Sequence, residues 1–101
     1  MLLKIVSIYD GKAEAWMNPL VFQSNGQAIR SFGDAVNDSS SELGKHPEDY
    51  DLFELGEFDQ LTGDIKKLKA PAHLAKGLNL VAAQTIADVR KAFTVENGDV
   101  V

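Results

Sequence analysis

The chain has no cysteine among its 101 residues. Without a thiol it can form no disulfide framework, no thiolate zinc site and no cysteine nucleophile. Long apolar runs are also missing. Lys4 and Ser7 interrupt the apolar stretch near the N-terminus, whereas a membrane-spanning helix needs about 20 apolar residues. We therefore expect neither a secretory signal nor a membrane segment.

Motifs of catalysis and cofactor binding are missing too. The sequence has no GxxxxGK[ST] or GxGxxG phosphate loop, and its two histidines, His46 and His73, have no partner at a metal-ligand spacing. Glu48, Asp49 and Asp51 lack the order of an EF-hand loop. A weak metal site at His46 and acid–base work by neighbouring carboxylates are minor alternatives. The sequence thus predicts a protein that is not an enzyme and that binds no metal and no cofactor.

What the chain does contain is a strong separation of charge. Its net charge is −5. Residues 34–64 include ten acids and one base, whereas residues 65–91 include six bases and one acid. Such runs are usually solvated faces of adjacent elements. Alternatively, the molecule is polar, with one end that repels DNA and another that attracts DNA or an acidic partner.

Local patterns near the N-terminus predict a β-hairpin. Residues 2–9 carry apolar and β-branched side chains on both alternating faces, which is typical of a central strand covered on both faces. Asp10-Gly11 predicts a tight turn with Gly11 at positive φ. Residues 13–22 form the return strand. Pro19 has no N–H to donate and therefore indicates an edge strand or a bulge.

The next segment predicts an amphipathic helix. Ser24 can cap its first turn, and Gln27, three residues later, completes a capping box. Five apolar side chains then fall on one stripe at helical spacing: Ala28, Ile29, Phe32, Ala35 and Val36. Residues 38–47 are expected to form a polar loop.

A second hairpin is predicted after this loop. Residues 51–58 alternate, with Phe53 on one face and Phe58 on the other. Residues 59–64 form the turn, with Gly63 at positive φ. Residues 65–68 form a short return strand, so that acids face lysines across the hairpin and stabilise it.

The remaining residues complete the predicted fold. Ala70-Pro71-Ala72 breaks the chain, and apolar residues at helical spacing from Leu78 to Phe93 predict a C-terminal amphipathic helix. The predicted class is α+β, a small, mainly antiparallel sheet of two β-hairpins with a helix between them and a helix at the end, in the order ββαββα. Residues 1–93 form a single domain, and residues 94–101 are expected to fray.

Aromatic and basic side chains make nucleic-acid binding the leading functional hypothesis. Small β-rich domains hold single strands with a basic groove and aromatic rings on which bases stack. The candidate stacking residues are Tyr9 and Trp16, with Tyr50 near the second hairpin. The candidate phosphate contacts are Lys12, Arg30, Lys66, Lys67, Lys69 and Lys76. A lone tryptophan on a strand also fits a core or a dimer interface.

Two stretches of sequence are more specific than these patterns. They are "KIVSIYDGKAEAWMNPLVFQSNGQAIRSFGDAVND" and "KHPEDYDLFELGEFDQLTGDI". Between Lys4 and Ile65 the chain resembles the small nonstructural protein of gokushoviruses, the single-stranded-DNA phages of the Microviridae. The resemblance implies a protein made in the cytoplasm of the infected bacterial host. It implies DNA binding or a role where replication switches to the synthesis and packaging of single-stranded genomes. It implies no active-site residues.

The acidic segment supports an alternative function. The residues Glu48, Asp49, Tyr50 and Phe53 could form a docking patch for a phage replication or capsid protein, with the aromatic rings as anchors and the acids at the rim. In that case the protein is an adaptor that recruits the replication initiator or procapsid. Alternatively, Tyr50 and Phe53 close the core over the first helix. For either function we expect a homodimer, formed by the edge near Pro19 or by the C-terminal helix.

Overall fold

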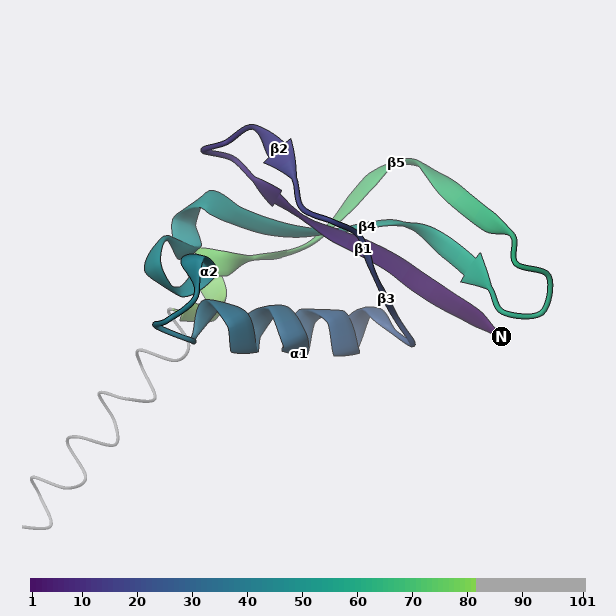
Figure 1. The fold of residues 1–101 in the computed structure, drawn as a ribbon, viewed down its shortest axis with the longest axis horizontal. Coiled ribbons are helices and arrows are strands. Elements are labelled where there is room, and N and C mark those ends of the chain that lie inside the picture. The colour runs from purple at the N-terminus through teal and green to yellow at the C-terminus, as the bar shows by residue number, and fades with distance from the viewer. Residues whose placement is uncertain (82–101) are drawn as a thin grey trace, which may run out of the picture.

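An antiparallel sheet with one helix laid along it forms the framework of the protein (Figure 1). The structure is a computed structural model and describes residues 1–81. The elements in chain order are β1 (Leu2–Asp10), β2 (Ala15–Trp16), β3 (Leu20–Phe22), α1 (Asn25–Val36), α2 (Glu42–Lys45), the 3-10 helix η1 (Pro47–Asp49), β4 (Tyr50–Asp59) and β5 (Ile65–Lys76). The α+β class is confirmed, but the predicted ββαββα order is interrupted by three additional short elements, β3, α2 and η1.

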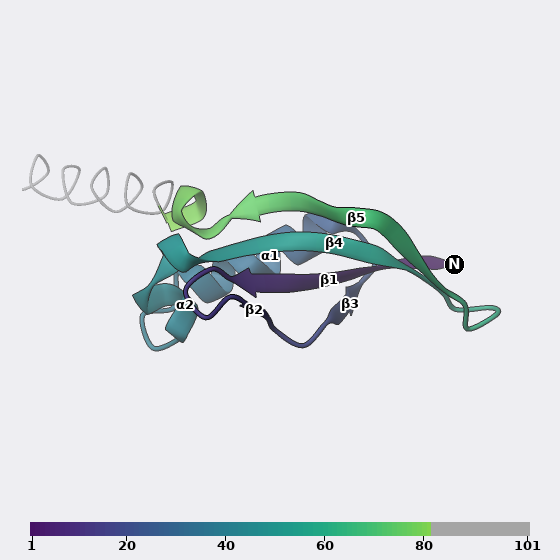
Figure 2. The same cartoon turned by 90° about the horizontal axis from the view of Figure 1, so that it is seen from above.

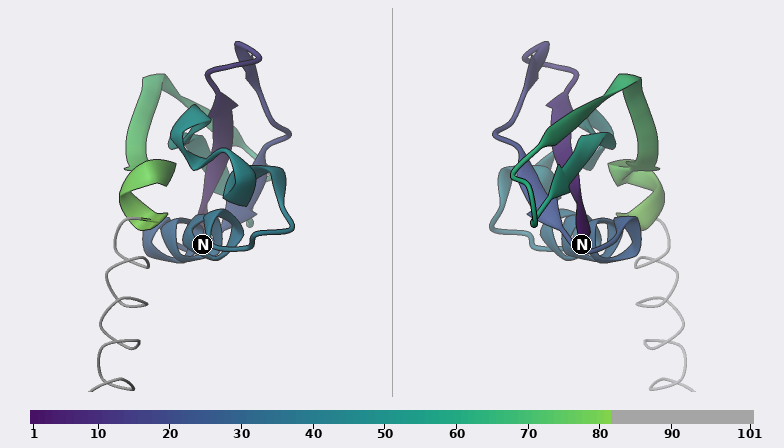
Figure 3. Two further views of the ribbon diagram at one scale, coloured as in Figure 1. Left: turned by 90° about the vertical axis from the view of Figure 1, so that its left-hand side faces the viewer. Right: turned by 90° about the vertical axis from the view of Figure 1, so that its right-hand side faces the viewer.

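The strand β1 lies in the interior of the sheet, as predicted, but within residues 1–81 a helix covers only one of its two faces. It pairs with β4 on one side, and with both β2 and β3 on the other, while β5 pairs with β4 and forms the far edge. The helix α1 covers one face of this sheet (Figures 1 and 3). The opposite face carries no helix among the described residues, and we call it the open face.

The first hairpin departs from the prediction at its turn. Its loop comprises residues 11–14, and Asp10 Oδ1 accepts hydrogen bonds from the backbone N–H groups of Lys12, at 3.0 Å, and Ala13, at 3.1 Å. The residue in the left-handed region is Glu14, with φ 56°, and not Gly11. The prediction for Gly11 was therefore wrong, because the loop is longer than a two-residue turn.

The return strand of this hairpin is split, which agrees with the prediction of an edge strand or bulge at Pro19. Ladder pairing stops between β2 and β3, and Pro19 lies in the gap. The buried hydroxyl of Ser7 donates a hydrogen bond to the carbonyl oxygen of Met17 at 2.6 Å. This side-chain bond fastens the interrupted edge to β1.

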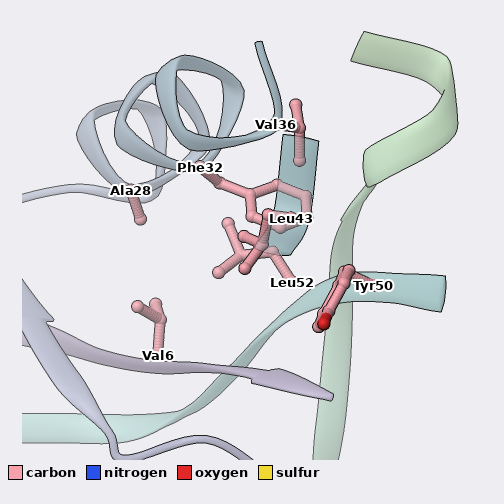
Figure 4. Close-up of a cluster of buried hydrophobic side chains, with 7 residues drawn as sticks. All are labelled: Val6, Ala28, Phe32, Val36, Leu43, Tyr50 and Leu52. Carbon is pink, nitrogen blue, oxygen red and sulfur yellow. The ribbon is translucent and has the colours of Figure 1, made fainter. Parts of the chain in front are cut away.

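The helix α1 begins and packs as its sequence predicted. Ser24 Oγ accepts a hydrogen bond from Gln27 N, which is the first bond of the predicted capping box. The return bond differs from the prediction, because Gln27 Oε1 accepts from the N–H of Gln23, the residue before the cap, and not from that of Ser24. Its buried stripe meets side chains of β1, α2 and β4 in a single core (Figure 4). That core consists of Val6, Ala28, Phe32, Val36, Leu43, Tyr50 and Leu52.

The polar loop predicted for residues 38–47 contains helical structure instead. Ser41 caps α2 by accepting a hydrogen bond from Gly44 N at 2.9 Å. The turn buries Leu43 against the end of α1. The prediction was wrong because a four-residue helix is too short to leave a periodic signal.

The second hairpin is longer than predicted and irregular. Its return strand runs to Lys76 instead of ending at Leu68. The β4–β5 register jumps from Glu54↔Ala72 to Gly56↔Lys67, so four residues of β5, 68–71, lie opposite one residue of β4 and bow outward. Ala70-Pro71-Ala72 thus interrupts pairing without ending the strand.

Residues 77–81, which follow β5, are helical, and Leu80 and Val81 pack against the core. The rest of the predicted helix from Leu78 to Phe93, and the tail 94–101, lie outside the described residues.

Candidate nucleic-acid interface

Four ring side chains form a row across the open face. Trp16 of β2 lies 5.0 Å from Tyr9 of β1 and 5.1 Å from Phe53 of β4, measured between ring centroids, and Phe53 lies 5.1 Å from His73 of β5. The interplanar angles are 60°, 70° and 76°. We call Tyr9, Trp16, Phe53 and His73 the aromatic row. It crosses all the strands at this level of the sheet.

Strand alternation explains why the row lies on the open face. Tyr9 and Phe53 alternate with Ile8 and Leu52, which pack into the core beneath α1. Ser7 is the register partner of Phe53 and has a small, buried side chain, so Trp16 can reach past it to the Phe53 ring.

The rings are packed against one another and still accessible. Trp16 is 45% exposed, His73 is exposed, and Tyr9 and Phe53 are half-buried. Tilted and edge-to-face contacts are the arrangements that aromatic pairs prefer. The row is therefore a preformed apolar surface that leaves ring area free for a ligand.

Some of the predicted phosphate contacts belong to this face. Lys67 pairs in register with Gly56 and lines a hollow on the open face, and Lys76 pairs with Asp51 beside His73. Lys69 is exposed on the bowed part of β5. Lys12 lies in the loop that follows Tyr9 and Asp10.

Two of the predicted contacts do not belong to it. Arg30 is exposed on α1, which covers the other face of the sheet. Lys66 pairs with Glu57, which lies on the α1 side with Lys4. The structure thus separates Arg30 and Lys66 from the aromatic row.

One acid lies at the end of the row. His73 Nε2 and Asp51 Oδ1 are 2.9 Å apart, which fixes the imidazole edge-on to Phe53. Sequence reasoning did not assign His73 to a site, because only the β4–β5 register brings it beside Phe53.

The predicted docking residues do not form one surface. Tyr50 is 8% exposed and belongs to the core, whereas Phe53 is in the aromatic row on the opposite face. Burial, followed by the negative charges of Asp10, Glu42 and Asp49, raises the pKa of the Tyr50 hydroxyl. Glu48 is exposed on η1. The acidic segment therefore lacks the aromatic anchors that the adaptor hypothesis required.

Ligand atoms of His46, Glu48 and Asp49 lie within 4.8 Å of one another. Exposed acidic groups of this kind are common without an ion, so the absence of a metal site stays a prediction. Within residues 1–81, no helix has the length and apolar character needed to cross a membrane.

Comparison with known proteins gives the chain a family. The model of the Phage ORF5 protein family matches residues 3–80, and the chain belongs to this family. The match covers all the strands described above except Leu2, the first residue of β1. Protein ORF5 of Chlamydia phage 1 is 43% identical over 61 residues. That alignment covers 56% of this chain and 64% of the relative, which is less than two thirds of the relative's length. No solved structure matches the chain.

These matches confirm the relationship to small nonstructural proteins of gokushoviruses. The family identifies a phage accessory protein.

Proposed function

We propose that this phage protein binds single-stranded DNA across the open face of its sheet and acts as an accessory factor in genome replication, single-strand synthesis or packaging. The observation that carries the proposal is the aromatic row, which is partly exposed and lies on the face of the sheet that carries no helix within residues 1–81.

The row suits unpaired bases. Each base of a single strand offers a π-face, and stacking on a protein ring contributes roughly 1–3 kcal/mol per base. Bases in a duplex are already stacked on one another and present only their edges in the grooves. We therefore expect single strands to bind more tightly than duplexes.

The acidic net charge is compatible with this proposal, because many acids face away from the row. Glu54 and Glu57 contact Lys4 on the face that α1 covers. Asp51, beside the row, contacts His73. The binding of phosphates depends on the local field more than on the net charge.

The number of lysines on the open face limits the salt dependence. Among the described residues, four basic side chains belong to this face or its rim: Lys12, Lys67, Lys69 and Lys76. Each phosphate neutralised on a single strand contributes about 0.7 to the slope of log K against log salt. These four lysines are therefore expected to contribute a slope of about −3.

The test is a titration of labelled oligonucleotides with purified protein, followed by fluorescence anisotropy and by the emission of Trp16 at several salt concentrations. A Trp16→Leu variant should weaken binding of single strands, and so should Phe53→Leu. Quenching of Trp16 by DNA in the native chain should accompany the anisotropy change, because the indole is in the row.

Charge reversal offers a matched control. Lys69→Glu and Arg30→Glu change the charge equally at exposed positions, but only Lys69 is on β5, at the edge of the open face. Lys69→Glu should weaken binding and reduce the salt slope, whereas Arg30→Glu should change both less. Equal losses for the two variants would reject the open face as the site. Failure of the folded protein to bind any oligonucleotide would reject DNA binding itself.

A further inference from the structure

An apolar hollow lies on the open face under the bowed part of β5. Its volume is about 280 Å³. Its apolar walls are the side chains of Ile5, Leu55, Ile65, Leu68 and Pro71. Gly56 also lines it, and Lys67 brings the one polar side chain among its lining residues in the described chain.

The chemistry of the hollow selects its occupant. A nucleobase buried there would lose the water around its polar edges and gain few hydrogen bonds in return, which is unfavourable. An aliphatic side chain has no polar groups that would lose water, and its burial is favourable. The hollow is therefore suited to an apolar side chain of a protein.

The turn between β4 and β5 presents such a side chain, and we call residues 59–64 the tip. Leu61 is 87% exposed. Its backbone is held in place by short bonds within the turn: Leu61 N to Asp59 Oδ1 at 2.9 Å, Gly63 N to the Asp59 carbonyl oxygen at 2.7 Å, and Asp59 N to the Asp64 carbonyl oxygen at 2.9 Å. A preformed turn loses little entropy when its tip binds.

Other exposed apolar residues surround this tip. Gln60 N donates a hydrogen bond to the carbonyl oxygen of Met1, and Ile65 pairs with Phe58 at the start of β5. Met1, Leu2 and Ile65 are all exposed. Figures 1 and 2 show that this end of the hairpin extends past α1, so α1 does not cover it.

Charge makes the tip and the hollow complementary. The tip carries the acids Asp59 and Asp64, whereas the hollow is lined by Lys67, and Lys69 lies on the bowed part of the same strand. The Asp59 carboxyl is negatively charged at neutral pH, and hydrogen bonding from the Leu61 backbone N–H lowers its pKa further below the ordinary value of 3.8.

From these features we propose that two copies of the chain form a dimer through their β4–β5 hairpins, with Leu61 of each copy seated in the hollow of the other. Because each copy carries both Leu61 and the hollow, a two-fold axis makes both contacts at once and closes the assembly. The acids of each tip then lie against the lysines of the other copy. The proposal does not depend on DNA binding.

Its test is the oligomeric state of the full chain, measured by sedimentation velocity over a range of protein concentrations. The native chain should dimerise, and Leu61→Asp should be monomeric with an unchanged circular dichroism spectrum, because the exposed Leu61 side chain is not part of the core. Met17→Asp, also at an exposed residue but on the far edge of the sheet, should leave the dimer intact. A native chain that is monomeric at every concentration, or a Leu61→Asp variant that dimerises like the native chain, would overturn the proposal.

Cysteine pairing tests the geometry, since the native chain has no thiol. A mixture of Leu61→Cys and Leu68→Cys proteins should form a mixed disulfide on mild oxidation, faster than either variant pairs with itself. An Asp34→Cys variant, exposed on α1, should not pair with Leu68→Cys at this rate. Mixed pairing no faster than this control would overturn the proposed contact between Leu61 and the hollow. Loss of the Leu61 contact leaves the aromatic row in place, so a failed dimer and a failed DNA interaction are separate results.

Discussion

Lys4 Nζ lies 3.0 Å from Glu57 Oε2 and 3.6 Å from Glu54 Oε2, so one ammonium group joins two carboxylates of β4. A bulge at Leu55 brings these acids to the same face, because the register passes from Ile5↔Gly56 to Val6↔Glu54. Glu54 is only 8% exposed and also accepts a hydrogen bond from Asn25 Nδ2 at 2.9 Å. The cluster thus ties the first turn of α1 to the sheet.

Replacing Lys4 by Met should lower the melting temperature of the protein. The substitution keeps the aliphatic stem and leaves the buried Glu54 carboxylate without its cation, which is unfavourable. Adding Glu54→Gln to the same chain should recover part of the loss. The measurement is thermal unfolding followed by circular dichroism at neutral pH.

Lys45 provides the control for this prediction. Its Nζ lies 3.9 Å from Glu42 Oε1, and both side chains are exposed. An exposed pair of this kind contributes roughly 0–1 kcal/mol. Lys45→Met should therefore change the melting temperature less than Lys4→Met. Equal effects of the two substitutions would show that the Lys4 cluster does not stabilise the fold.

The sequence predicted the elements that are determined by residues close to one another along the chain. Ser24 and Gln27 mark the start of α1 three residues apart, and the stripe through Phe32 identifies its buried face. The two bulges escaped prediction because a register depends on the partner strand. The extra residue Leu55 places Phe58 opposite Leu3 on the open face, where strict alternation had put it with the core face.

The aromatic row was predicted only in part, because some of its contacts are local in sequence and others depend on strand pairing. Tyr9 and Trp16 face each other across one hairpin, so a candidate pair could be identified from a short stretch of sequence. Phe53 and His73 join them only through the pairing of β1 with β4 and of β4 with β5. Charge alone could not separate Lys67 from Lys66, because which face each lysine occupies follows from the register.

Replacing Glu14 by Gly should stabilise the protein by up to about 1 kcal/mol. Glu14 has φ 56°, where a side chain is disfavoured and glycine is not. For a domain of this size the gain corresponds to a rise in melting temperature of roughly 4–8 °C per kcal/mol. Glu14→Ala retains the Cβ atom and should give no such rise. If Glu14→Gly instead lowers the stability, the interactions of the Glu14 side chain stabilise the fold by more than the positive φ destabilises it.

Lowering the pH should remove the contribution of the Asp59 carboxylate to the stability of the fold. Hydrogen bonding from the Leu61 backbone N–H lowers the pKa of this carboxyl in the folded state below its ordinary value of 3.8. A lowered pKa adds stability that is present above the unfolded value and is lost as the pH falls through the folded value. The difference in melting temperature between the native chain and Asp59→Asn should be constant near neutral pH and should shrink below about pH 4. A difference that is the same at every pH would contradict this role.

Replacing Gly56 by Ala should destabilise the protein by about 1–3 kcal/mol. A Cβ atom at this position would clash with the backbone carbonyl oxygen of Lys66, so β5 would have to move away from β4 beside the hollow. Gly26→Ala is the matched control, since a Cβ atom there meets nothing closer than Ser24 Oγ at 3.8 Å. Because Gly26 lies in the first turn of α1, the control should be neutral or more stable by about 0.4–1 kcal/mol. The measurement is thermal unfolding of both variants. If Gly56→Ala is as stable as the native chain, β4 and β5 can separate at this point without loss of stability.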